Sequence, residues 1–164
     1  MYSGKSANPF HVSVGAVLTN QNGKICAHHF TGDIPFFDAV PVDGLYFLMR
    51  ETVEVGESLT TAVKRGISEE FGATGEVNTY LGSIRSHFDN RDEVSIEKTT
   101  LYFHVRCAHF NPQNRDSNDP ESISEIVWLD PEQLIKKMES QSADTDRTDL
   151  NDAKIIKRYL KYER

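Results

Sequence analysis

The stretch GESLTTAVKRGISEEFG, residues 56–72, combines the signals that begin and end a helix with charged side chains at unexpected places. Ser58 is a residue type that caps helix N-termini, and Gly72 stands where glycine commonly ends a helix. The sequence therefore predicts a helix between them. Gly66 falls in its middle, where glycine costs about 1 kcal/mol relative to alanine, so helix propensity gives no reason for it.

The predicted helix has one broad apolar face when its residues are placed about 100° apart. Gly66 and Glu70 lie within this apolar arc, and Glu69 lies at its edge. Burying an unpaired carboxylate is expensive, so an inward Glu70 needs a cation, a hydrogen-bond network or a water-filled cleft. The apolar residues expected to pack on a sheet are Leu59, Ala62, Val63, Ile67 and Phe71.

Glu57, Glu69 and Glu70 together form a set of hard oxygen donors, which suits Mg²⁺ or Mn²⁺. Two explanations without a metal are also available for these glutamates. Paired glutamates on a helix usually form a solvated face, and Arg65 can pair with Glu69 one turn away, a contact of only about 0.3 to 0.5 kcal/mol. Neither alternative explains why Glu70 points inward.

The rest of the chain reads as strands with a few helices, which predicts an α+β or mixed α/β class. Asp130, Pro131 and Gln133 predict a helix start with a capping box, and residues 140–149 read as a polar connection. The other expected elements are strands at residues 11–19, 24–31, 44–49, 77–87, 99–107 and 125–129, a hairpin turn at 20–23, a loop at 111–124 and a final helix at 150–160.

Composition limits the possible partners. A chain of 164 residues with 38% apolar residues is long enough for one domain spanning 1–164. Eighteen basic and 25 acidic residues give a net charge of -7, which argues against attraction to long nucleic acid or to an anionic membrane. An anionic ligand would need local cations or a bound metal.

The cysteine pattern predicts a reduced, cytoplasmic setting. Cys26 and Cys107 are far apart and neither lies in a CxxC or zinc-like spacing. The opening residues lack the basic and apolar segments of a secretory signal, and no run approaches about 20 apolar residues. We therefore expect a soluble cytosolic protein.

The quoted stretch resembles the signature of the Nudix hydrolase family. That signature runs Gly, five residues, Glu, seven residues, Arg-Glu, an aliphatic, any residue, Glu-Glu, any residue, Gly and an aliphatic. The strand GAVLTN before it, the strand EKTTLYFHV after it and the junction EIVWLDPEQL also look like family counterparts. The matching positions are Glu57, Arg65, Ile67, Glu69, Glu70 and Gly72.

The resemblance implies an αβα sandwich around a mixed sheet and metal-dependent hydrolysis of a diphosphate bond in a nucleoside diphosphate derivative. It implies Glu69 and Glu70 as metal ligands, with Glu57 an outer ligand or the partner of Arg65, and Arg65 as a residue that orients carboxylates. Glu69 could act as general base, and family precedent leaves three glutamates outside the signature open: Glu97, Glu121 and Glu125. The partner is then a small phosphorylated molecule, and a homodimer is allowed.

Two positions depart from the signature. The opening Gly falls on Glu51, and the Glu after the signature Arg is Gly66; Ala73 is only a weak aliphatic match. A module that binds a nucleotide-like ligand without cleaving it is therefore the alternative function. Three readings of Gly66 stay open: another part of the chain packs closely against that turn of the helix, the ligand at this position was lost by drift, or the Glu51 carboxylate compensates for the missing one and joins the metal ligands.

Substrate contacts are predicted on segments that the resemblance places near the cleft. The candidate residues for phosphate or base are Arg50, Arg85, His87 and Lys98, each of which could instead be a surface charge. His28 and His29 are discounted as a metal pair, because adjacent strand residues point to opposite faces.

Overall fold

The computed structural model describes residues 10–32, 44–89 and 95–163. Its helices are α1 (Leu59–Phe71), α2 (Pro131–Thr145) and α3 (Ala153–Tyr162), with short 3-10 turns η1 (Pro112–Asn114), η2 (Pro120–Ile123) and η3 (Thr148–Leu150). Its strands are β1 (Phe10–Thr19), β2 (Ile25–Phe30), β3 (Leu45–Phe47), β4 (Met49–Thr52), β5 (Ala73–Asp89), β6 (Ser95–Phe110) and β7 (Glu125–Leu129). Among these described helices, none is both long enough and apolar enough to cross a membrane.

The strands form one seven-stranded mixed sheet. Its main order is β3-β2-β1-β6-β5, while β4 pairs with β1 and β7 pairs with β2. The β1–β6 pair is parallel and the other pairs are antiparallel. The mixed sheet implied by the resemblance is therefore confirmed.

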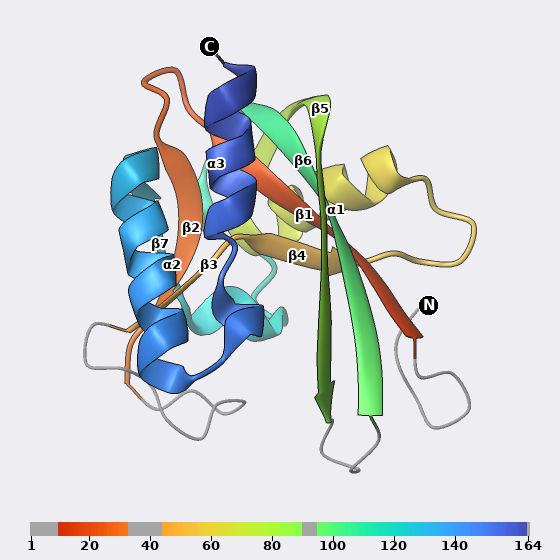
Figure 1. Cartoon of the computed structure of the whole chain (residues 1–164). Coiled ribbons are helices and arrows are strands. Elements are labelled where there is room, and N and C mark those ends of the chain that lie inside the picture. Colours follow the sequence, from red (N-terminus) through yellow and green to blue (C-terminus); the bar gives the residue numbers. More distant parts are fainter. Residues whose placement is uncertain (1–9, 33–43, 90–94, 164) are drawn as a thin grey trace.

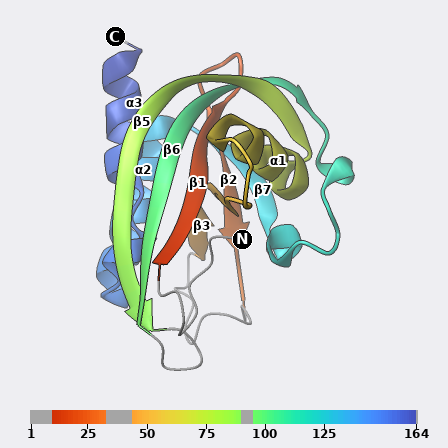
Figure 2. The same cartoon turned by 90° about the vertical axis from the view of Figure 1, so that its right-hand side faces the viewer.

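Helices cover both faces of this sheet, which gives the expected αβα layers (Figure 1). In the turned view of Figure 2, α1 lies on one side of the strands and α2 with α3 on the other. Each layer has its own buried core: Ile67 and Phe71 of α1 pack with Val14 of β1, and Met138 of α2 packs with Ile155 of α3. The sheet thus holds α1, with its carboxylates, on a rigid surface.

Helix α1 begins and ends at the predicted residues. The Ser58 side chain accepts a hydrogen bond from the Thr61 N–H at 3.1 Å, and Gly72 adopts a left-handed φ of 63°. The predicted apolar face is buried except at Leu59, which is 38% exposed. That part of the prediction was wrong because Leu59 is the first helical residue and lies beyond the turns that pack on the sheet. Gly66 and Glu70 are buried, as predicted.

The sequence predicted a single strand at residues 44–49, and this prediction was wrong: the segment is divided between β3 and β4. The chain leaves β3 at Leu48 and re-enters the sheet as β4, so β3 pairs with β2 while β4 pairs with β1. This switch brings Arg50 and Glu51 of β4 next to the central strand, where Glu51 lies opposite Val14. The short apolar run hid the break because both halves are buried.

The C-terminal helices differ from the prediction at their ends. Helix α2 continues to Thr145 through the segment expected to be a polar connection. The reason is Gln141, whose buried amide bonds to both backbone groups of Tyr46 and to the Leu150 carbonyl. Asp130 is the N-cap residue and Pro131 follows it, but the expected side-chain cap bond is absent from the described structure. Helix α3 begins at Ala153 rather than at Leu150.

Candidate functional site

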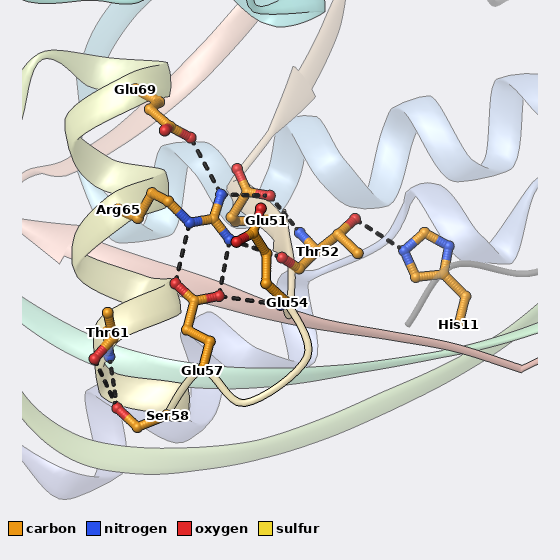
Figure 3. Close-up of polar contacts among 9 residues, drawn as sticks. All are labelled: His11, Glu51, Thr52, Glu54, Glu57, Ser58, Thr61, Arg65 and Glu69. Atoms are coloured by element: carbon orange, nitrogen blue, oxygen red, sulfur yellow. Dashed lines mark hydrogen bonds and ion pairs between the residues drawn. The ribbon is translucent and has the colours of Figure 1, made fainter. Parts of the chain in front are cut away.

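Arg65 of α1 lies at the centre of a cluster of carboxylates (Figure 3). Its Nη1 lies 3.1 Å from Glu51 Oε1 and 3.2 Å from Glu69 Oε2. Its Nε and Nη2 donate to the two oxygens of Glu57, at 3.1 and 3.0 Å, and Nη2 also donates to the Thr52 carbonyl at 2.9 Å. One guanidinium thus holds a strand carboxylate and two helix-side carboxylates together, which agrees with an orienting role.

Glu57 contacts Arg65 with both carboxylate oxygens, as one of the two roles that the resemblance left open requires. Both of its oxygens are engaged by Arg65, and Oε2 also accepts from the Glu54 N–H at 3.0 Å. The hydrogen bond from Arg65 lowers the pKa of Glu57. These contacts hold Arg65 against the loop before α1, while the role of Glu57 as an outer metal ligand stays a prediction.

Glu70 points inward and is only 3% exposed. Its Oε2 lies 2.8 Å from Nε2 of His28, whose Nδ1 lies 2.7 Å from Ser124 Oγ. Burial raises the pKa of Glu70 well above its usual range and lowers the pKa of His28 to about 3. His28 is consequently neutral at pH 7, and Glu70 has the hydrogen-bond network that its burial requires.

Arg115 fixes the loop that carries Ser124 against the end of α1. Its Nε donates to the Glu70 carbonyl, its Nη1 to the Ser124 carbonyl, and its Nη2 to the Glu121 carbonyl and to Ser124 Oγ, all within 3.0 Å. The loop predicted at 111–124 is therefore anchored at several points. Its anchoring brings Glu121 toward Glu70.

Sequence reasoning did not identify His28 or Arg115 as parts of this site. The argument that His28 and His29 diverge is correct, since His29 stacks on Tyr46 with ring centroids 4.4 Å apart. The same alternation, however, puts His28 on the side of Cys26, which packs in the α1 core. The alternation of side chains along the strand could therefore have indicated His28 as a partner of Glu70. The sequence carried no comparable signal for Arg115.

A cavity of about 180 Å³ opens beside Glu70. Of the predicted substrate residues, Arg50 and Lys98 line it. Arg85 and His87 do not: both are exposed on β5, and His87 bonds to Ser95 Oγ. The remaining lining residues are His28, Phe30, Phe47, Leu48 and Glu121, so two cations and two carboxyl groups face one space with aromatic walls.

Arg50 is held at its outer end by a buried carboxylate. Its Nη2 donates to Asp152 Oδ2 at 2.7 Å, and the Tyr102 hydroxyl donates to Asp152 Oδ1 at 2.8 Å. The guanidinium also lies 5.7 Å from the centroid of the Phe47 ring. Its Nε is buried and has no hydrogen-bond partner among the described residues. Arg50 therefore joins the cavity to the start of α3.

Lys98 and Glu121 are two cavity groups whose charge changes near pH 8. Burial, with Arg50 nearby, lowers the pKa of Lys98 to about 8. Burial and the neighbouring Asp119 raise the pKa of Glu121 to about 8. Of the other two glutamates outside the signature, Glu97 does not line the cavity and Glu125 is 71% exposed beside His29.

The predicted metal ligands are near one another but are not arranged as a formed site. Within residues 10–32, 44–89 and 95–163, no three Asp, Glu, His or Cys side chains converge as metal ligands do. Glu51 and Glu69 face Arg65, and Glu70 faces His28. In kind, the donors are the carboxylate oxygens that Mg²⁺ and Mn²⁺ prefer. Glu69, at 37% exposed, can turn without unpacking the helix.

The sequence is similar to a known domain family and to a known protein. The family profile described as the NUDIX domain matches residues 9–148. An RNA pyrophosphohydrolase from Novosphingobium aromaticivorans is 28% identical over 138 residues, covering 77% of this chain and 81% of that protein.

Solved structures share the fold at low sequence identity. The E. coli ORF135 protein has a TM-score of 0.63 at 18% identity, covering 97% of this chain and 94% of that one. A MutT protein from Methanosarcina mazei Go1 has a TM-score of 0.60 at 17% identity, covering 95% and 96%. A NUDIX hydrolase from Nitrosomonas europaea has a TM-score of 0.63 at 18% identity, covering 94% and 90%.

Proposed function

The chain belongs to the Nudix family, and from this premise we propose that it hydrolyses the diphosphate bond of a nucleoside diphosphate derivative with the help of a divalent metal. As a Nudix-type pyrophosphohydrolase, it cleaves a bond between two phosphate groups. The observation that carries the proposal is the cavity in which Glu70 faces Arg50 and Lys98. Such a space offers an acidic group for a metal and cations for the phosphate oxygens.

We assign Mg²⁺ or Mn²⁺ to the carboxylates of Glu51, Glu69 and Glu70. Such an ion, when bound, neutralises phosphate charge and lowers the pKa of a bound water. Arg65 keeps the carboxylates of Glu51 and Glu69 side by side, and His28 fixes the orientation of Glu70. These contacts position the ligands before substrate arrives, so less reorganisation is needed during the reaction.

In the proposed reaction, Lys98 and Arg50 bind phosphate oxygens while a water attacks one phosphorus and the second phosphate leaves. We propose Glu121 as the general base, because it lines the cavity with Glu70. With its pKa raised to about 8, the carboxylate form that accepts the proton is the minor form at pH 7 and increases as the pH rises. Glu69, the other candidate, faces the Arg65 guanidinium at 3.2 Å and is not among the lining residues. A base must reach the proton that it takes within hydrogen-bond distance.

The second candidate substrate is an RNA whose 5′ end carries a bond between two phosphate groups. It is favoured by the 28% identical relative, whose name is RNA pyrophosphohydrolase. The net charge of -7 favours the small molecule, because binding of long nucleic acid depends on neutralising many phosphates. An RNA substrate would need basic residues outside the cavity to bind its further phosphates, whereas a small molecule would not.

The proposed function is tested with a panel of nucleoside diphosphate sugars, dinucleoside polyphosphates, nucleoside triphosphates and a 5′-triphosphorylated RNA oligonucleotide. We expect phosphate or nucleotide release with Mg²⁺ or Mn²⁺ and loss of release on adding EDTA. Turnover that survives EDTA would contradict the metal requirement. Thermal stabilisation by a compound of the panel without any turnover would instead support the binding module.

The setting of the reaction is part of the same proposal. Cys26 and Cys107 are both free thiols, as in a reducing compartment, and we propose a cytoplasmic enzyme acting on a small phosphorylated molecule. Whether the chain forms a homodimer stays a prediction, which sedimentation in solution would test.

Lys98 gives a pH-dependent prediction for substrate binding. Its pKa is lowered to about 8, so the ammonium is present at pH 7 and is lost as the pH rises to 9. If the ammonium binds phosphate, KM should rise about tenfold over this interval, as expected for one ionisation. Glu121 also ionises over this interval, so the Lys98→Arg variant, which stays charged, should show a smaller rise in KM than the native protein. Equal profiles in the two proteins would remove Lys98 from the binding site.

A further inference from the structure

The two positions that depart from the Nudix signature contact each other. A Cβ atom added to Gly66 of α1 would lie 2.7 Å from the Cβ of Glu51 on β4. It would also lie 2.6 Å from Sδ and 3.1 Å from Cε of Met49. Non-bonded carbon atoms prefer separations of about 3.5 to 4.0 Å. No side chain therefore fits at position 66 while Glu51 and Met49 stay where they are.

Glu51 is the firm part of this obstruction. The end of the Met49 side chain is a flexible thioether that can move aside. The Cβ of Glu51, in contrast, is fixed by a backbone that pairs with β1, where Glu51 lies opposite Val14. Helix α1 approaches β4 closely because position 66 has no side chain. This close approach explains the mid-helix glycine, for which helix propensity gave no reason.

The Glu51 carboxylate reaches the group of helix carboxylates from the strand side. Its Oε1 lies 3.1 Å from Arg65 Nη1, the same nitrogen that Glu69 approaches at 3.2 Å (Figure 3). The Thr52 N–H donates to the same oxygen at 2.7 Å, which fixes the direction of the carboxylate. Glu51 is thus placed beside Glu69, one of the two proposed helix ligands.

We infer that positions 51 and 66 form a reciprocal pair, in which β4 supplies through Glu51 the carboxylate that the Nudix signature carries on the helix. Only one of the two positions can hold a side chain at the observed distance between α1 and β4. The two departures are then one linked change rather than two separate losses. The steric part stands on the contacts alone, whereas the metal-binding part rests on the proposed function.

The steric part is tested by a double-mutant cycle on the metal-free protein in EDTA. Gly66→Ala alone should lower Tm by about 4 °C or more, because overpacking outweighs the gain in helix propensity. In a Glu51→Gly background the same change should leave Tm equal or raise it, because the firm obstacle is gone and alanine favours the helix. An equal loss of Tm in both backgrounds would overturn the reciprocal pair.

The metal part is tested by Mn²⁺ binding, measured by electron paramagnetic resonance or calorimetry without substrate. Glu51→Gln keeps the Cβ and removes the charge, and should weaken Mn²⁺ binding about tenfold or more. Glu54→Gln, which changes an exposed carboxylate in the loop after β4, is the matched control and should bind normally. The double variant Glu51→Gly with Gly66→Glu should recover Mn²⁺ binding relative to Glu51→Gly alone.

Unchanged Mn²⁺ affinity in Glu51→Gln would overturn Glu51 as a ligand. Failure of the proposed function is a separate result: the substrate panel would show no turnover, although the thermal cycle and the Mn²⁺ measurements gave the expected differences. The three readouts therefore distinguish the fit between helix and strand, the ligand and the reaction.

Discussion

Replacing Glu70 with glutamine is expected to lower kcat/KM by about 10³-fold while leaving the protein folded. A metal at a phosphate contributes several kcal/mol to the transition state, and each 1.36 kcal/mol corresponds to a factor of ten. Glu70 is the proposed ligand that also lines the cavity. Glutamine keeps the size and the hydrogen bond to His28 but removes the negative charge that holds a cation.

The folded state should tolerate this change well. Burial raises the pKa of Glu70, which means that its charged form costs stability at neutral pH. Removing that charge should leave Tm unchanged or raise it. Loss of activity together with an equal or higher Tm would therefore separate a functional role from a structural one.

Glu125→Gln is the matched control for Glu70→Gln. Glu125 is 71% exposed and lies outside the cavity, so its replacement should change neither kcat/KM nor Tm. Mn²⁺ titration of the metal-free proteins gives a second readout, in which only the Glu70 variant should bind more weakly. Full activity in the Glu70 variant would rule out the proposed metal site.

The inward position of Glu70 was predictable because it depends on local rules. Ser58 and Gly72 fix the start and end of α1, and the angular spacing within the helix then determines which side chains face the sheet. These rules, which use only residues of the helix itself, correctly predicted the buried face of α1 and the contact between Arg65 and Glu69. It failed for Leu59, because exposure at a helix end depends on where the sheet stops.

The partners of Glu70 could not be predicted in the same way. His28 comes from β2, and Ser124 and Arg115 come from a loop after β6, so their meeting depends on strand order and register. Close packing against Gly66 was one of the readings that the sequence left open, but the packing partner could not be identified for the same reason. Its neighbour Glu51 lies on β4, and the distance between that strand and α1 is a property of the folded sheet rather than of either segment.

The second large effect is expected at Asp152, which is 1% exposed and pairs with Arg50. Asp152→Ala leaves the Arg50 guanidinium without its counter-charge and the Tyr102 hydroxyl without its acceptor. Breaking a buried pair by removing one partner costs about 3 to 5 kcal/mol. For a chain of this size that corresponds to a fall in Tm of roughly 10 °C.

Asp149→Ala is the control, because it removes a carboxylate from the same segment but from an exposed pair. Asp149 Oδ2 lies 2.7 Å from Arg147 Nη2, and both side chains are partly exposed. Such pairs contribute at most about 1 kcal/mol to the free energy of unfolding. Tyr102→Phe should fall between the two, since it removes one hydrogen bond worth about 1 kcal/mol. If Asp152→Ala cost no more than Asp149→Ala, the buried pair would not be what fixes α3.

The Asp152 variant should also bind substrate more weakly, and this links the C-terminal helix to the reaction. Arg50 lines the cavity with one part of its side chain and holds Asp152, just before α3, with the other. Without Asp152 the guanidinium can leave its place beside Phe47, so KM should rise more than kcat falls. Assays at a temperature where the variant is still folded would separate this effect from unfolding. A KM that stayed normal there would mean that Arg50 serves the fold and not the substrate.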